Sequence, residues 1–169
     1  MIPKIENILY TTGLGSGTPY VFRYALSLAQ KYDAKIHIIH GHEPLSSSAQ
    51  SMADLYMVQE TANDVLERTI AEVEQKILER LERLCAKETS SDPKGRERVA
   101  SITVAKLPAK QAILEEAEKR KVDLIVMGSH RHSVLADAML GTTTLKVLHQ
   151  STIPVLVVRI PKNYQEEGF

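Results

Sequence analysis

The sequence predicts an α/β fold, an open twisted parallel sheet of five strands with helices on both faces. Two observations predict this class. Short apolar runs rich in β-branched residues alternate along the chain with longer segments of helical periodicity. In addition, the run LIVM at 124–127 is apolar without alternation and ends at a glycine. Such a run is typical of a strand that is buried on both faces in a parallel sheet.

The first strand, helix and strand form a predicted βαβ unit. An apolar segment leads into Tyr10-Thr11 and predicts a short strand, which a glycine-rich turn at 13–17 follows. In Thr18-Pro19 the threonine is predicted as the N-cap of a helix and the proline as its first residue. A second strand at 36–39 ends in the sequence His-Gly-His at 40–42. The crossover between the two strands should be right-handed.

A long helical pattern follows a Ser-rich loop at 44–51. It begins near Asp54, and charged residues lie opposite its apolar stripe. Cys85 lies on the apolar face and is predicted as a small core residue. The pattern is longer than a crossover between two strands needs. Residues 55–57 could therefore project from the domain, or cover a pocket or a partner. The apolar stripe consists of Val58, Ala62, Val65, Thr69, Val73, Ile77, Leu81 and Leu84.

The second half continues the alternation. A loop at 90–95 precedes a third strand at 99–104, and Pro108 starts a helix. A last helix follows, and a last strand at 153–158 completes the sheet. In the helix after Pro108, the expected inward residues are Ile113, Leu114 and Ala117, and the expected outward pairs are Glu115–Lys119 and Glu116–Arg120. In the last helix, Leu145, Leu148 and His149 share a face.

The stretch 121–159 organises the rest of the chain. A buried strand ends at Gly128-Ser129, a polar segment follows, and Gly141-Thr142-Thr143-Thr144 opens a helix. Glycines let a backbone approach an anion, and unpaired N–H groups at a helix start and threonine hydroxyls can donate hydrogen bonds to it. The pattern therefore predicts a phosphate or nucleotide cradle. The alternative is that Gly128 and Gly141 only form tight turns.

Composition limits the other classes of function. A chain of 169 residues fits one domain, 1–160, with a polar tail at 161–169. The formal net charge is zero, so nothing general favours nucleic acid or an acidic membrane surface. No apolar run approaches a membrane span, and the first residues lack a signal-peptide pattern. Cys85 is the only cysteine, which excludes an intramolecular disulfide and makes a reducing cytoplasm the expected location.

The same stretch resembles the C-terminal half of a universal stress protein domain. ATP-binding members of that family carry Gly, two residues, Gly, nine residues, Gly, and then Ser or Thr. Gly128 matches the first glycine and Gly141-Thr142 match the last pair, whereas Arg131 occupies the middle glycine position. The ending STIPVLVVR at 151–159 is also similar to the family's last strand. The resemblance extends over nearly the whole chain.

The resemblance implies a Rossmann-like, adenine nucleotide α-hydrolase-like sheet with strand order 3-2-1-4-5. Ligands of such sheets bind at the carboxyl ends of the strands, where the winding reverses, here between strands one and four. It further implies ATP or AMP as ligand, with room for Mg on the phosphates, and a homodimer formed through Val155–Val158. The implied nucleotide-binding residues are Thr11, Thr12, Gly13, Gly41, Met127, Gly128, Ser129, His130, Arg131, Gly141, Thr142 and Thr143.

Two departures from the family pattern leave alternatives open. Gly13 stands where the family has an Asp that faces the nucleoside, whereas the backbone contact implied for Gly41 needs no particular side chain. Arg131 either fills the phosphate position or contacts the phosphate as a charged group. The first alternative function is therefore a dimeric interaction protein of the same family that binds no nucleotide.

The residues leave three further functions open. A metal site could use His40 and His42 with His130 and His132, although about 10 Å of sheet would separate the two pairs. The glycine turn at 13–17 loosely matches a dinucleotide fingerprint, with Glu43 as the acid, but its third glycine falls one residue early. For an enzyme, the sequence has no nucleophile elbow or Walker lysine motif. Asp123 and Asp137 are the carboxylates nearest to the predicted cradle. Asp123 begins a strand and is expected at the far edge of the sheet, so slow ATP hydrolysis is the most that we expect.

Overall fold

The computed structural model describes residues 2–42, 59–92, 94–129, 140–161, 164 and 166, with the backbone alone at 59–67. Its elements in chain order are β1 (Asn7–Thr11), α1 (Thr18–Tyr32), β2 (Lys35–Gly41), α3 (Gln59–Glu88), α4 (Gly95–Arg98), β3 (Val99–Ala105), α5 (Ala109–Arg120), β4 (Leu124–Gly128), α6 (Thr142–Gln150) and β5 (Val155–Val158).

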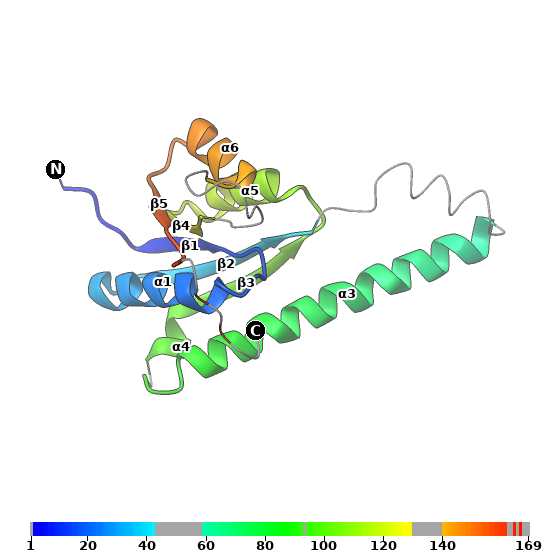
Figure 1. Ribbon diagram of the computed structural model, residues 1–169, viewed down its shortest axis with the longest axis horizontal. Coiled ribbons are helices and arrows are strands. Elements are labelled where there is room, and N and C mark those ends of the chain that lie inside the picture. Colours follow the sequence, from blue (N-terminus) through cyan, green and yellow to red (C-terminus); the bar gives the residue numbers. More distant parts are fainter. Residues whose placement is uncertain are drawn as a thin grey trace.

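The sheet has five parallel strands in the order β3-β2-β1-β4-β5, as predicted. Helices α1 and α3 cover one face of the sheet, and α5 and α6 cover the other (Figure 1). The central strands alternate between the two cores, so that Ile8 and Tyr10 of β1 face α1 while Leu9 faces α5. This double burial explains the unbroken apolar run of β4, in which Ile125 and Val126 are fully buried on opposite faces.

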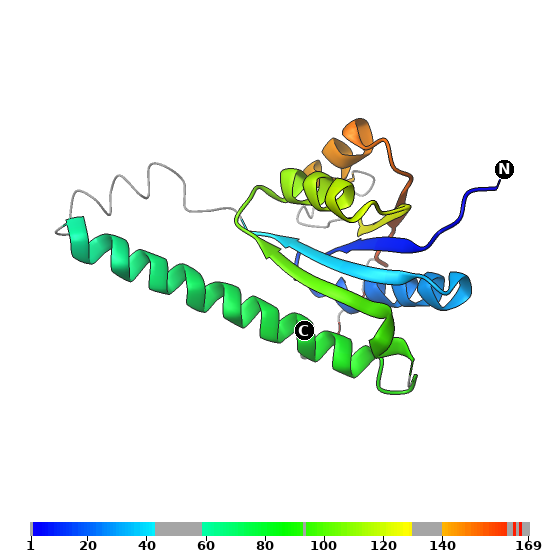
Figure 2. The same ribbon diagram turned by 180° about the vertical axis from the view of Figure 1, so that it is seen from behind.

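Helix α3 is longer than the sheet that it crosses, as the sequence predicted. Its N-terminal half extends beyond the strands, which both ribbon views show (Figures 1 and 2). In its C-terminal half Leu81, Leu84 and Cys85 are buried in the core, and burial raises the pKa of the Cys85 thiol to about 12. The predicted loop at 44–51 and the predicted helix residues 54–58 lie outside the described residues. Among the helices that are described, none is long and apolar enough to cross a membrane.

Two helix starts differ from the prediction. Thr18 is not an N-cap, because α1 begins at Thr18 itself and Gly17 occupies the cap position without a side-chain hydrogen bond. The Thr18 hydroxyl lies 3.3 Å from the Thr12 hydroxyl, so it serves the preceding loop instead of the helix end. Helix α4 falls at the end of the predicted loop at 90–95. Its four residues, GRER, have no apolar periodicity from which a helix could be predicted.

In α5 one residue that was predicted to face outward is buried. Glu116 was expected outward but is buried, and its Oε1 accepts hydrogen bonds from Thr103 at 3.1 Å and from Arg120 at 2.9 Å. A buried carboxylate is tolerated here because the edge strand β3 supplies a hydroxyl and the helix supplies a guanidinium. In α6 the buried residues are Thr144 and Val147, whereas Leu148 is exposed.

Candidate functional site

The predicted site residues gather where the winding of the sheet reverses. Strands β1 and β4 are neighbours, and the chain leaves β1 for α1 on one face and β4 for α6 on the other. Thr11 ends β1 and is followed by Thr12 and Gly13, while Met127 and Gly128 end β4 and are followed by Ser129. Gly141 to Thr143 start α6. His130 and Arg131 lie outside the described residues, so both interpretations of Arg131 stay predictions.

Thr12 is bound through all three of its polar groups. Its N–H donates to the Ile39 carbonyl at 3.1 Å, and its hydroxyl accepts from the Leu14 N–H at 3.1 Å. Its carbonyl accepts from Nδ1 of His40 at 2.8 Å. These bonds hold the Thr12 side chain within its own loop. Thr12 therefore shapes the loop at the edge of the proposed site, and its contact with a nucleotide stays a prediction.

The loop after β1 contains an unusual backbone conformation at Leu14. Its φ is 59°, in the left-handed region, which is costly by about 1–2 kcal/mol for a residue with a side chain. The Leu14 side chain packs against the core on the α1 face, and this contact holds the residue in place. Neither Gly15 nor Gly17 has a left-handed φ. The sequence pointed to the glycines, whereas the residue with the left-handed backbone is Leu14, directly before Gly15.

Gly128 has a packing reason to be glycine. A Cβ at Gly128 would lie 3.0 Å from Cγ2 of Val21 and 3.4 Å from Cδ1 of Ile160. A Cβ at Gly17 would lie only 2.4 Å from the same Ile160 atom. The two glycines thus make room for the Ile160 side chain, which contacts the start of α1 and the end of β4. This finding supports the alternative in which Gly128 needs no ligand to explain it.

The residues on either side of Gly128 are structural as well. Met127 is 3% exposed and lies in the core with α5 and α6. Ser129 is 9% exposed, its N–H donates to the Val158 carbonyl at 2.9 Å, and its hydroxyl accepts from the Ile160 N–H at 3.3 Å. Thr11 is buried in β1, opposite Ile39 of β2. These side chains fix the strand ends and do not project from them.

The start of α6 offers hydrogen-bond donors. The first bond along the helix runs from the Leu145 N–H to the Gly141 carbonyl at 3.0 Å, so the amides that precede Leu145 lie in the first turn. Gly141 makes no side-chain cap, and the first turn has no acidic residue. The Thr144 hydroxyl donates to the Gly128 carbonyl at 3.2 Å and fixes this turn to the end of β4. A helix start of this kind attracts an anion.

Gly41 is also explained by packing. A Cβ there would lie 2.5 Å from Cα of Ala109, at the start of α5. Glycine therefore lets the connection from β3 to α5 pass over the end of β2. The His42 N–H donates to the Ala105 carbonyl at 2.8 Å and continues the pairing of β2 with β3. The contact of Gly41 with an adenine remains an expectation.

The other site hypotheses are tested only in part. Within the described ranges no group of three or more His, Cys, Asp or Glu residues could hold a metal, and His130 and His132 lie outside those ranges. Glu43, the acid of the dinucleotide hypothesis, and Asp137 also lie outside them. Asp123 lies at the amino end of β1, as predicted, where its Oδ2 accepts from the N–H groups of Glu6 and Asn7 at 2.8 and 2.9 Å.

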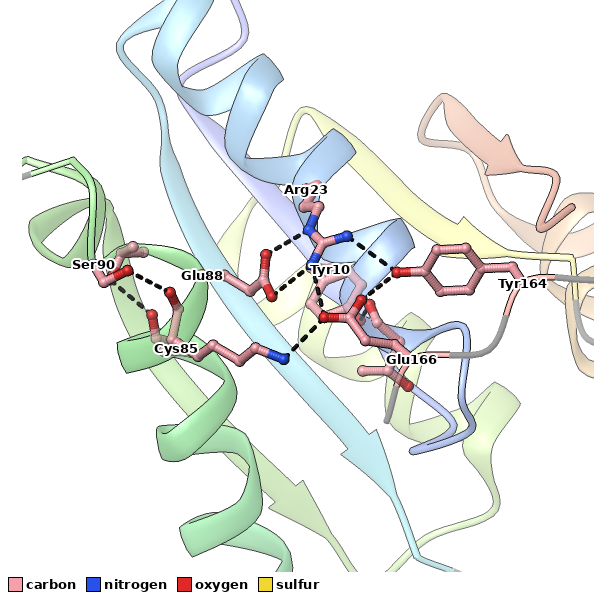
Figure 3. A network of polar contacts seen from close by, with 10 residues as sticks. Tyr10, Arg23, Cys85, Glu88, Ser90, Tyr164 and Glu166 are labelled. Carbon is pink, nitrogen blue, oxygen red and sulfur yellow. Dashed lines mark hydrogen bonds and ion pairs between the residues drawn. The ribbon is translucent and has the colours of Figure 1, made fainter. Parts of the chain in front are cut away.

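A second polar cluster joins the C-terminal tail to α1 and α3 (Figure 3). Arg23 donates to both carboxylate oxygens of Glu88, at 2.6 and 3.0 Å, and to Glu166 at 2.9 Å. Lys87 also pairs with Glu166 at 2.9 Å, and the Tyr164 hydroxyl donates to the same carboxylate. Sequence reasoning missed this cluster, because its members are far apart in the chain and each resembles an ordinary surface charge.

The fold defines an open doubly wound α/β domain whose winding reverses between β1 and β4. The model of the universal stress protein family matches residues 4–159, and the chain belongs to that family. It is 33% identical to "Universal stress protein YxiE" of Bacillus subtilis over 80% of this chain and 86% of the relative. It is 34% identical to "Universal stress protein A homolog 2" of Coxiella burnetii over 80% of this chain and 82% of that relative.

Solved structures share the Rossmann-like fold. The structure of universal stress protein UspA from Lactobacillus plantarum superposes with a TM-score of 0.64 at 17% identity, covering 94% of this chain and 100% of that one. A universal stress protein in complex with cAMP gives 0.55 at 19% identity, covering 93% and 98%. The universal stress protein of Archaeoglobus fulgidus in complex with dAMP gives 0.50 at 12% identity, covering 90% and 96%. At these identities the likeness shows the fold alone.

Proposed function

We propose that this protein binds an adenine nucleotide, ATP or AMP, at the carboxyl ends of β1 and β4. The observation that carries the proposal is the pairing of a rigid loop after β1 with an uncapped start of α6, joined to β4 through the bond from Thr144 to Gly128. Membership of the family supports it, as do the two solved family members bound to cAMP and dAMP.

The roles of the residues follow from their positions. The amides of Thr142 and Thr143 would hold phosphate oxygens at the positive end of α6. The backbone of Gly13 and Gly41 would contact the nucleoside, and Arg131 with His130 would add positive charge beside the phosphates. Mg²⁺, when present, would neutralise phosphate charge. In this proposal the protein is a nucleotide-dependent regulatory module of a stress response, and no residue is assigned a catalytic role.

Nucleotide binding is tested first on the protein as purified. The protein is denatured and removed, and the supernatant is chromatographed for adenine nucleotides, quantified per chain. Titration calorimetry with ATP and AMP then follows on empty protein. Near-stoichiometric nucleotide or saturable binding supports the proposal. No bound nucleotide and no heat at millimolar ATP would contradict it.

A matched pair of variants locates the site. In Gly141→Asp the new side chain caps α6 but places a negative charge where the phosphate would lie, and in Gly141→Asn it caps α6 without charge. The φ of Gly141 is −58°, which either residue can adopt. The proposal expects the Asp variant to lose ATP binding and the Asn variant to retain part of it, with both remaining folded. Equal ATP affinities in the two variants would place the phosphates elsewhere.

The alternative is a family member that acts through protein contacts alone. The packing of Gly41, Gly17 and Gly128 favours it, because each glycine is explained without a ligand. Both versions include a homodimer formed through Val155–Val158. β5 is an edge strand, and Val155 to Val157 are half-buried. A cytoplasmic location is also part of the proposal, since the adenine nucleotides that it names are abundant there.

Light scattering tests the dimer. The wild type should have twice the chain mass of 18.8 kDa. Val157→Lys should shift the protein toward the monomer, because it places a charge on the edge strand β5. The matched control is Val104→Lys, which changes a half-buried valine of β3 at the opposite edge. A monomeric wild type, or equal effects of the two variants, would contradict an interface at β5.

A further inference from the structure

His40 contacts the loop after β1 from the neighbouring strand. It lies near the end of β2, half-buried, on the sheet face that α3 covers, and its Nδ1 is 2.8 Å from the Thr12 carbonyl. A carbonyl oxygen can only accept a hydrogen bond, so Nδ1 carries the hydrogen. The neutral ring is therefore the Nδ1–H tautomer, with its lone pair on Nε2.

This bond extends the link between β1 and β2 beyond the sheet. The paired residues of the two strands end at Thr11 and Ile39, and the Thr12 N–H donates to the Ile39 carbonyl. The bond from His40 Nδ1 to the Thr12 carbonyl connects the two strands one position further on. It acts on the peptide that joins Thr12 to Gly13, and Gly13 is exposed and has no side chain to restrain it.

The direction of that peptide follows from its planarity. The peptide is trans, so the Gly13 N–H points opposite to the Thr12 carbonyl. The carbonyl points to His40 on β2, and the N–H therefore points away from β2. Since β4 lies on the other side of β1, this N–H is directed toward the switch point.

We propose that His40 is a positioning residue for the nucleotide site, because it holds the Gly13 N–H toward an acceptor atom of the bound nucleotide. The inference rests on the proposed function and adds a donor to it. At Gly13 the family has an Asp, a side-chain acceptor. In this chain Gly13 offers its backbone N–H as a donor, and His40 of the neighbouring strand β2 sets the direction of that N–H.

The strained neighbour supports this role. A rotation of the Thr12–Gly13 peptide would disturb Leu14, whose left-handed backbone is held by the Thr12 hydroxyl and by core packing. Around His40, burial lowers the ring's pKa, His42 and Arg80 of α3 lower it further, and the bond to Thr12 opposes this shift. Protonation adds a hydrogen at Nε2 and leaves the Nδ1–H in place, so substitution is the appropriate test.

Two variants separate the hydrogen bond from the volume of the ring. His40→Asn keeps an N–H donor near the position of Nδ1, whereas His40→Leu fills the space and leaves the Thr12 carbonyl without its partner. We expect His40→Leu to weaken ATP binding by about tenfold and His40→Asn by less than about threefold. In the Leu variant the Leu14 amide should exchange with solvent faster, while amides in the middle of β1 should keep their protection.

The outcomes are distinguishable from failure of the proposed function. If the wild type binds no nucleotide, the proposed function fails, and Leu14 exchange still tests whether His40 holds the Thr12–Gly13 peptide in place. Unchanged exchange and unchanged affinity in His40→Leu would overturn the inference. A measurement on the wild type covers the case in which that variant does not fold. ¹⁵N spectra should show the Nδ1–H tautomer of His40 at neutral pH, and an Nε2–H tautomer would overturn the inference.

Discussion

The hydroxyl of Thr144, in the first turn of α6, donates to the carbonyl of Gly128 at the end of β4, 3.2 Å away. Thr144 is 1% exposed and Gly128 is half-buried, so this bond is partly shielded from solvent. The sequence predicted Gly128 as part of the phosphate cradle, and it predicted Thr144 only as part of a helix start. The bond fixes the position of the proposed phosphate-binding turn relative to the sheet.

Replacing Thr144 by valine should therefore destabilise the protein and weaken nucleotide binding. Valine has nearly the same shape but no hydroxyl, and it leaves the partly buried Gly128 carbonyl without this donor, at a cost of about 1 kcal/mol. Urea unfolding measures the loss of stability, and calorimetry measures the ATP affinity. Thr144→Ser, which keeps the donor, should lie closer to the wild type. A valine variant as stable as the wild type would show that the bond contributes nothing.

Gly41→Ala should destabilise the protein, whereas Gly15→Ala should not. A methyl group at 41 would lie 2.5 Å from the backbone of Ala109, and forcing such contacts usually costs about 1–3 kcal/mol. At 15 the same group meets nothing within 4 Å, so the variant should be neutral or more stable by up to about 1 kcal/mol. Thermal unfolding of the two variants checks this contrast. Similar losses in both would contradict the packing explanation of Gly41.

Stability should decrease as the pH falls from 7 toward 5. Burial lowers the pKa of His37, and the Arg120 cation lowers it further. The ring is held neutral, since Nε2–H donates to Asn7 and Nδ1 accepts from Ser101 at 2.8 Å. Above the unfolded pKa of about 6.5 both states are neutral, and nothing changes. Below it the unfolded chain takes up a proton first, so stability is lost until the lower folded pKa is passed.

Denaturant unfolding at several pH values measures this dependence. His40 contributes with the same sign, because burial also lowers its pKa. The carboxylates Glu116 and Glu166, whose pKa values are lowered, act at lower pH and leave this range to the histidines. His37→Gln should reduce the slope between pH 7 and 5 without removing it. An unchanged slope in that variant would show that His37 is not the group responsible.

Glu166→Gln should loosen the C-terminal tail with little effect on global stability. The carboxylate pairs with Arg23 and Lys87, and its bonds to Tyr164 and Lys87 lower its pKa to about 2. The cations are largely exposed, so the loss should stay below about 1 kcal/mol. Limited proteolysis should cut the tail faster in the variant, and salt should speed the cutting of the wild type. Cutting at equal rates would show that the cluster does not hold the tail.

The prediction from sequence succeeded where one physical rule decided the outcome. Apolar runs gave the strands, and the family resemblance gave their order. It failed where distant polar groups decided the outcome. Glu116 resembles a surface charge until the fold places Thr103 beside it. The bonds that Thr12 makes with Leu14 and His40 could likewise not be predicted from the sequence. Such pairings depend on strand register and loop conformation, which one-dimensional periodicity does not encode.

The length of α3 has a consequence for how the molecule unfolds. At about 1.5 Å per residue its 30 residues span roughly 45 Å, and among its described side chains, from residue 68 on, the core contacts lie toward the C-terminal end. Helical segments that gain little from tertiary packing are only marginally stable in water. Heating should therefore melt α3 from its N-terminal end before the sheet unfolds. Circular dichroism would record this as a shallow, early loss of helicity ahead of the main cooperative transition.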